Sequence, residues 1–206
     1  MKQLFFGILT LLPVLLCGEP AARPVKVVLF PVREAEIVSR EACAVSGCDV
    51  ARFAFQCVDP ELKIDVVLPD GSRASAGDVI LRVSGKAASI LTGERVALNF
   101  MQRMCGISTM TAKFVDAVSD YGTLVLDTRK TTPGLRIFEK YAVTCGGGTN
   151  HRFGLFDRIL MKDNHRRLWR GGDPDALDQA VAAARKKFPG LEVEIEEELY
   201  EDGMFK

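Results

Sequence analysis

The stretch LVLDTRK at residues 124–130 decides the fold, together with RILMK at 158–162 and LEVEIE at 191–196. Each is a short apolar or alternating run of the kind that is typical of a β-strand. A helical pattern follows each of the first two strands. Residues 133–148 run from Pro-Gly to a triple glycine, and residues 173–190 run from Asp-Pro to Pro-Gly. Strand, helix, strand, helix, strand predicts a parallel α/β barrel or open sheet.

The preceding part of the chain mixes shorter strand and helix signals. Ile64–Leu68 and Val79–Val83 flank a Pro-Asp-Gly turn and predict a hairpin. The apolar spacing predicts a helix over Glu94–Met104, which continues or restarts over Thr109–Val118. Further strands are predicted at 25–32 and 36–39, and a further helix at 50–57.

Composition bounds the class of protein. The chain has 206 residues, of which 48% are hydrophobic, and is long enough for one good core or two modest ones. Lysine plus arginine balances aspartate plus glutamate at 27 each, so the net charge points to neither nucleic acid nor a membrane surface. The six cysteines form no CxxC pair, and two histidines supply no zinc-ligand spacing. We therefore expect a cytoplasmic enzyme with reduced cysteines.

The segment 1–24 carries a different signal. Lys2 precedes the apolar run Leu4–Leu16 and then Cys17, as in a secretory signal peptide. Leu15 and Leu16 stand where a signal peptide has small residues, and the run is too short to span a bilayer. The segment is therefore signal-like, or a hydrophobic helix of the fold, or unrelated to the rest of the chain. Export is the alternative to a cytoplasmic location.

Cationic side chains gather where the predicted parallel strands end. Arg129 and Lys130 follow the first strand, Lys162 ends the second, and His151 and Arg152 lie in the connection between them. The carboxyl ends of parallel strands form one ligand-binding face. Two like charges about 4 Å apart repel by roughly 4 kcal/mol at an effective dielectric near 20, so we expect a ligand with several negative charges. Solvated surface cations are the alternative.

The triple glycine Gly146–Gly148 exceeds what a helix stop needs, and its backbone amides are predicted to approach a phosphate. A plain helix stop is the alternative. The sequence contains neither GxxxxGK[ST] nor GxSxG, so it supports neither nucleoside triphosphate hydrolysis nor a serine-type catalytic triad.

Several of these motifs resemble one family almost residue for residue. The strings GER at 93–95, LNF at 98–100 and CGI at 105–107 match it, as does the whole stretch from Asp127 to His165. This pattern resembles the quinolinate phosphoribosyltransferase family, also called nicotinate-nucleotide pyrophosphorylase (carboxylating). The resemblance covers about residues 31–196.

The resemblance implies an α/β fold in two domains. An N-terminal α/β sandwich domain at 25–106 would be followed by an incomplete parallel α/β barrel at 107–206, the phosphoribosyltransferase domain. It also implies a homodimer in which the sandwich domain of one subunit closes the barrel of the other.

The family reaction joins quinolinate to phosphoribosyl pyrophosphate with Mg²⁺ and releases pyrophosphate and carbon dioxide. Its product is nicotinate mononucleotide, a precursor of NAD. The implied substrate-binding residues are Arg95, Arg129, Lys130, His151, Arg152, Lys162 and Glu194. Arg95 would come from the partner subunit. Lys130 and Glu194 would be the catalytic residues, and Glu194 would hold the ribose hydroxyls or the metal.

Both ends of the chain depart from the family pattern, at residues 1–24 and 197–206. We therefore expect a chain truncated at both ends. A catalytically inactive truncated homologue, which at most binds quinolinate or a partner subunit, is the alternative function. Arg129 and Arg152 argue against a paralogue with another substrate. The hairpin at 65–85 resembles a lipoyl or biotinyl carrier module, but neither of its tips has a lysine to modify.

Overall fold

The computed structural model describes residues 25–30, 34–169 and 176–196. The chain divides into two compact units, Met1–His151 and Arg152–Lys206, and each is described by itself. The signal-like segment 1–24, the predicted helix start at Asp173 and Pro174, and the segment 197–206 lie outside the described residues. Within the described ranges, no helix is both long enough and apolar enough to cross a membrane.

An antiparallel four-stranded sheet, in the order β1-β2-β6-β4, forms the first part of the first unit. Ile37 and Leu81 face each other across two strands and are fully buried. Their neighbours Glu36 and Arg82 form an ion pair at 3.0 Å on the other face, because successive side chains of a strand point to opposite faces. The strands of this unit are β1 (Val25–Phe30), β2 (Glu34–Ser39), β3 (Cys43–Ala44), β4 (Lys63–Val66), β5 (Arg73–Ala74) and β6 (Val79–Ser84).

The strands predicted near residues 25 and 36 and the antiparallel pairing of β4 with β6 are confirmed. The connection between β4 and β6 is longer than a tight turn because it contains β5, which pairs with β3. Asp70 in this connection accepts the backbone N–H groups of Gly47 at 3.1 Å and Cys48 at 3.0 Å. Cys48 begins α2 (Cys48–Val58), so the Pro-Asp-Gly turn also caps a helix.

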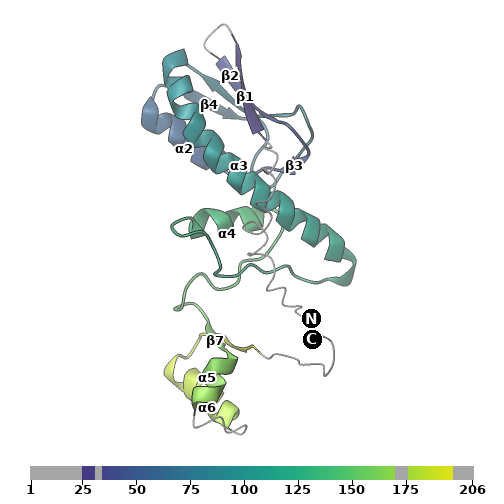
Figure 1. Ribbon diagram of the computed structural model, residues 1–206, viewed down its shortest axis with the longest axis vertical. Helices are drawn as coiled ribbons and strands as arrows, with labels where there is room; N and C mark the ends of the chain where they lie inside the picture. The colour runs from purple at the N-terminus through teal and green to yellow at the C-terminus, as the bar shows by residue number, and fades with distance from the viewer. Residues whose placement is uncertain (1–24, 31–33, 170–175, 197–206) are drawn as a thin grey trace, which may run out of the picture. The chain divides into compact units, whose positions relative to one another are not determined.

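Helix α3 (Ala87–Val118) is one continuous helix, so the two predicted segments Glu94–Met104 and Thr109–Val118 are joined. A short 3-10 helix, η1 (Ser119–Tyr121), follows it. Figure 1 shows α3 crossing in front of the sheet beside α2 and continuing to α4 (Arg136–Cys145), and α3 contacts all three. The domain boundary predicted after residue 106 falls within α3 and remains a prediction.

One face of α3 is buried along most of its length. The buried positions recur at steps of three and four residues, as expected for an amphipathic helix. They are Ile90, Gly93, Ala97, Leu98, Met101, Met104, Cys105, Ser108, Thr111 and Ala112. Ile90, Ala97, Leu98 and Met101 belong to the same hydrophobic core as the strands and α2. Phe55 of α2 lies in this core and is 1% exposed. The helix predicted at 50–57 is confirmed as α2.

The five described cysteines form no disulfide with one another. Cys43, Cys48 and Cys105 are buried. Burial raises the pKa of the Cys48 thiol, which keeps it protonated. Cys48 therefore behaves as a small apolar residue of the core.

The strand predicted at Leu124–Leu126 is shorter than expected. Leu126 forms a single parallel bridge with Thr149. The Thr149 N–H donates to the Val125 carbonyl at 2.8 Å, and the Asp127 N–H donates to the Thr149 carbonyl at 3.2 Å. The ladder ends there because the next donor, the His151 N–H, bonds to the Asp127 side chain at 2.8 Å instead of to a backbone carbonyl.

Gly146–Gly148 do not offer their amides to a phosphate, which corrects the prediction. The N–H groups of Gly146, Gly147 and Gly148 donate to carbonyl groups of α4 at 3.1, 2.9 and 3.0 Å. Glycine is required because α3 lies against this turn. A Cβ atom at Gly146 would clash with the Ser108 carbonyl oxygen, and one at Gly148 would lie 2.7 Å from Thr111 Cγ2. The triple glycine is therefore a helix stop that lets two helices approach closely.

The second unit contains the parallel strand pair β7 (Ile159–Met161) and β8 (Val193–Ile195), with Ile159 opposite Val193. Helix α6 (Ala176–Lys187) lies between them in the chain. Two strands and the helix are thus confirmed. Phe188 lies within the predicted helical range 173–190, but it follows the helix end and is 46% exposed.

Helix α5 (Asp163–Leu168) was not predicted, because six residues are too few to give a periodic apolar pattern. The Lys162 N–H donates to Nδ1 of His165 at 2.9 Å and closes the start of this helix. The described residues therefore have the predicted α/β fold. An antiparallel sheet with two helices is followed by a parallel strand pair with its own helices.

Replacing Gly146 by alanine is expected to lower the free energy of unfolding by about 1–3 kcal/mol, because the new Cβ overlaps backbone atoms of α3. Gly106→Ala is the matched control, since a Cβ at this position in α3 meets nothing within 4 Å. It should raise the free energy of unfolding by about 0.5–1 kcal/mol through better helix propensity. Urea denaturation measures both changes. Equal effects of the two substitutions would contradict the close packing of α4 on α3.

Candidate functional site

Three of the predicted site residues of the first unit, Arg129, Lys130 and His151, lie on two neighbouring segments. Arg129 and Lys130 lie in the loop between Asp127 and α4, and His151 follows the bridge at Thr149. Lys130 is exposed, Arg129 is half-buried and His151 is buried. The Leu126–Thr149 bridge joins the two segments, so residues more than twenty positions apart in the chain come together.

The Arg129 guanidinium has a donor that no described residue accepts. Its Nε is buried and has no hydrogen-bond partner among the residues that the structure describes. Nearly all buried N–H groups in proteins are paired, so such a donor calls for a ligand or a water molecule. The backbone below it is fixed, because the Arg136 guanidinium donates to the Arg129 carbonyl at 3.3 Å and to Thr131 Oγ1 at 3.1 Å.

A buried ion pair lies beneath the His151 segment. Lys140 Nζ of α4 donates to Asp127 Oδ1 at 2.6 Å, and both side chains are 3% exposed. The same carboxylate oxygen accepts the His151 N–H at 2.8 Å. With its amide nitrogen facing these acceptors, Asn150 donates to Asp127 Oδ2 at 2.8 Å and to the Lys140 carbonyl at 2.9 Å.

The environment of Asp127 acts on its ionisation in two directions. Burial raises the pKa of the Asp127 carboxyl, while the hydrogen bonds from Lys140 and from the His151 N–H lower it. The carboxylate is therefore held by its partners rather than by water. Removing one partner would leave the other charge buried without compensation.

Sequence reasoning gave no role to Asp127, Lys140 or Asn150. The sequence does contain a sign that Asp127 and Lys140 are buried. Asp127 directly follows an apolar run, and Lys140 is followed by the buried Ala142 and Val143 of α4. Charged residues at such positions are buried only when they are paired. The partner of each could not be identified from the sequence, because the two lie in different elements.

Two of the predicted residues of the second unit, Lys162 and Glu194, lie close to oppositely charged side chains of the same unit. Lys162 pairs with Glu196. Arg158, which was not predicted, pairs with Glu192 and lies 3.6 Å from Glu194. Arg152 is half-buried. Cations next to β7 thus lie opposite carboxylates of β8 and its flanking residues, and Lys162 and Glu194 both lie at this strand pair.

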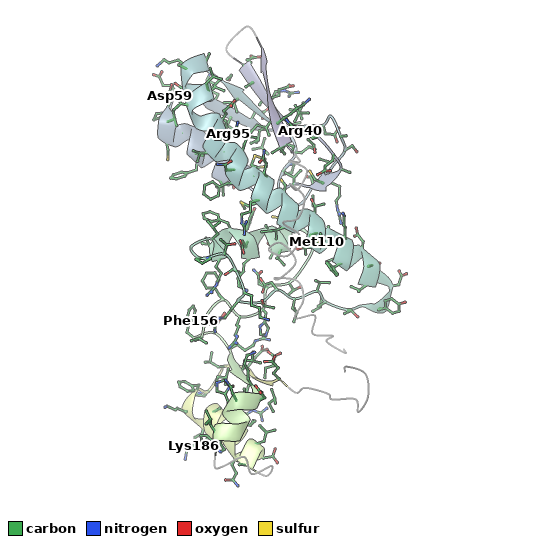
Figure 2. The ribbon with its side chains drawn as sticks, in the orientation of Figure 1. Arg40, Asp59, Arg95, Met110, Phe156 and Lys186 are labelled. Atoms are coloured by element: carbon green, nitrogen blue, oxygen red, sulfur yellow. The ribbon has the colours of Figure 1, made fainter. Side chains whose placement is uncertain are left out.

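Arg95 lies on α3, apart from the other predicted residues of the first unit. Its side chain is exposed, and Figure 2 labels it in the first half of the helix. It precedes Arg103, which contacts the loop before α4, by eight residues or about 12 Å of helix. Along α3, Arg95 therefore lies about two helical turns from the residue that contacts the loop of Arg129.

A preformed metal cage is not found among residues 25–30, 34–169 and 176–196. In these ranges no three His, Cys, Asp or Glu side chains gather as metal ligands would.

Replacing Asp127 by asparagine is expected to lower the free energy of unfolding by about 3–5 kcal/mol, because the Lys140 ammonium would stay buried without a counter-charge. Adding Lys140→Met should recover most of this loss, since the buried charge is removed as well. Chemical denaturation of the wild type, both single variants and the double variant measures the coupling. A double variant no more stable than Asp127→Asn alone would contradict the pairing.

The chain matches two family models along most of its length. The N-terminal domain of quinolinate phosphoribosyl transferase matches residues 30–105, and the C-terminal domain of the same family matches residues 107–204.

Curated relatives are similar over most of this chain. It is 44% identical over 165 residues to the probable nicotinate-nucleotide pyrophosphorylase (carboxylating) of Bacillus subtilis, with 80% of this chain and 56% of the relative covered. The probable enzyme of the same name from Synechocystis is 41% identical over 164 residues, with 79% and 54% covered. The chain thus spans about half the length of the curated relatives it matches.

Solved structures agree with this similarity. The nicotinate-nucleotide pyrophosphorylase of Francisella tularensis matches with a TM-score of 0.75 at 41% identity, covering 80% of this chain and 57% of that one. The enzyme of Ehrlichia chaffeensis matches with a TM-score of 0.71 at 31% identity, covering 96% of this chain and 71% of that one. With both domain models matched in order, the chain belongs to the quinolinate phosphoribosyl transferase family.

Proposed function

We propose that this protein transfers the phosphoribosyl group of phosphoribosyl pyrophosphate to quinolinate. The products are nicotinate mononucleotide, pyrophosphate and carbon dioxide, which places the protein in NAD biosynthesis. The observation that carries the proposal is the buried Nε of Arg129, which has no acceptor among the described residues, in a chain of this family. A carboxylate or phosphate oxygen is the acceptor that a guanidinium favours.

The charges of the proposed substrates suit the site residues. Quinolinate carries two carboxylates, and phosphoribosyl pyrophosphate carries several more negative charges. In the first unit, Arg129 and Lys130 supply cations for them, and His151 is proposed to bind them through its ring nitrogens. In the second unit, Arg152 and Lys162 are the proposed substrate-binding cations. Lys162 already has a carboxylate partner, Glu196, so a phosphate would exchange with that partner rather than meet a bare ammonium.

The main role of the protein in this reaction would be to position the two substrates and to stabilise the charges that develop. The pyridine nitrogen attacks the anomeric carbon of the ribose while the bond to pyrophosphate breaks, and pyrophosphate leaves with the electron pair. The positively charged ring then takes the electrons of the carbon–carbon bond as carbon dioxide leaves, and the ring carbon gains a proton. Lys130 would stabilise negative charge on the substrates, and Glu194 would hold the ribose hydroxyls as positive charge develops.

Mg²⁺ is proposed as the partner of the pyrophosphate group. Magnesium is commonly held by one or two carboxylates together with substrate phosphates, and it neutralises charge on the leaving group. Glu194 is the carboxylate proposed for this mode.

A homodimer is also part of the proposal. Arg95 is exposed on α3 and lies about two helical turns from Arg103, which touches the loop of Arg129 and Lys130. An exposed guanidinium in this position suits a ligand bound by a second copy of the chain. A cytoplasmic location is proposed as well, and the balanced net charge gives no reason to expect nucleic-acid or membrane partners.

Quinolinate is expected to bind the protein, and Arg129→Ala should weaken this binding by about 10- to 100-fold, because a charged hydrogen bond is lost. Arg40→Ala, at an exposed arginine of the same unit (Figure 2), should leave the dissociation constant unchanged. Nicotinate, which lacks one carboxylate, should bind more weakly than quinolinate. Isothermal titration calorimetry measures all three. Equal affinities for quinolinate in the two variants would remove the main support for the proposal.

Pyrophosphate release is expected when the protein is mixed with quinolinate, phosphoribosyl pyrophosphate and Mg²⁺, and not when any of the three is omitted. Lys130→Ala and Glu194→Gln should abolish the release while the protein stays folded. A coupled pyrophosphate assay measures it. Quinolinate binding without pyrophosphate release would instead support the alternative of an inactive homologue.

A further inference from the structure

Helix α4 holds both segments that carry the proposed ligand-binding residues of the first unit. The first segment, Arg129–Thr132, precedes the helix, and the second, Asn150–His151, follows it. Two adjacent residues of the helix, Glu139 and Lys140, reach one segment each. Both are buried, with 9% and 3% of their surface exposed.

Glu139 holds the first segment. Its Oε2 accepts the Thr132 N–H at 3.1 Å. Its Oε1 accepts Nε of Arg103 at 2.9 Å, and Arg103 also contacts the Thr132 hydroxyl. Arg103 lies on α3, so the carboxylate of Glu139 joins the loop, α4 and α3 in one network.

Lys140 holds the second segment through Asp127. Its ammonium donates to Asp127 Oδ1 at 2.6 Å, and that oxygen accepts the His151 N–H at 2.8 Å. The Lys140 carbonyl accepts the Asn150 amide at 2.9 Å, so main chain and side chain of one residue act on the same segment.

Neighbouring residues of an α-helix point about 100° apart, since a turn takes about 3.6 residues. Glu139 and Lys140 can therefore serve two different segments from one point of a rigid element. A shift of the first segment would break the bond from the Thr132 N–H to Glu139, and a shift of the second would break the bond from the His151 N–H to Asp127. Each loss would leave a buried carboxylate with one hydrogen bond fewer, which is unfavourable. The two charges thus fix the position of one segment relative to the other.

We propose that Glu139 and Lys140 are positioning residues, which set Arg129 and His151 at the spacing that one dicarboxylate ligand requires. The proposal rests on the proposed function for the identity of that ligand, quinolinate. Neither residue needs to touch the ligand. Glu139 acts through Thr132 and Lys140 acts through Asp127, and both prearrange the site before the ligand binds.

Two matched pairs of variants test this proposal. Glu139→Gln keeps an oxygen that accepts the Thr132 N–H, and Glu139→Ala does not. Asp127→Asn combined with Lys140→Met keeps an acceptor for the His151 N–H, and Asp127→Ala combined with Lys140→Met does not. Neither double variant leaves a buried charge, so both are expected to fold.

Quinolinate affinity and the ¹⁵N-resolved amide signals of Thr132 and His151 are measured for each variant, well below its unfolding temperature. The asparagine and glutamine variants should stay within about 3-fold of the wild-type dissociation constant. The alanine variants should bind on the order of 10-fold or more weakly, with displaced amide signals for the segment concerned. Lys113→Ala, at an exposed position of α3, is the control and should change neither readout.

Unchanged affinity in the alanine variants would overturn the proposal, and so would weaker binding with unmoved amide signals. A purely structural role would lower the unfolding temperature and leave the affinity of the folded protein unaltered, which also overturns it. If the wild type binds no quinolinate, the proposed function fails. The amide signals without ligand then still decide whether α4 sets the two segments.

Discussion

The first unit depends on the burial of one face of helix α3. This face packs against α2 and the small strands over its first part, and the end of α4 lies against Ser108 and Thr111 further along. One unbroken helix of 32 residues therefore reaches both the sheet and the loops that carry Arg129 and His151. Close approach requires glycine at Gly146 and Gly148, where a Cβ would meet atoms of α3.

Buried charges add a second level of constraint on top of this packing. Asp127, Glu139 and Lys140 lie within a largely apolar interior, where an unpaired charge is costly. Such pairs contribute little net stability compared with apolar residues of the same size, but they tolerate only one arrangement of their partners. Here they hold the two segments Arg129–Thr132 and Asn150–His151 in place. In the second unit, Arg158 and Lys162 pair with glutamates that are more exposed, so these pairs constrain less.

Local patterns were enough to predict much of the fold. The period of apolar residues identified α2 and the two parts of α3, and the residues at helix starts and stops identified α4 and α6. The turn residues identified the β4–β6 pairing. Predictions failed where a contact distant in sequence overrode the local signal. The strand at Leu124–Leu126 shrank to one bridge because the Asp127 side chain captured the His151 N–H. The glycines at Gly146–Gly148 were interpreted as a phosphate loop, although α3 occupies the space beside them.

The sequence by itself determined the α/β class, most helices and strands, and the family, because these follow from local periodicity and from motifs such as the stretch Asp127–His165. It also supplied the cations of the site. Only the tertiary structure decided which polar residues hold them, since Asp127, Arg103 and Glu139 find their partners across elements far apart in the chain. A charged residue within an apolar stretch of sequence indicates that a buried partner is needed. The packing of α3 and α4 selects that partner, and no local pattern encodes this packing.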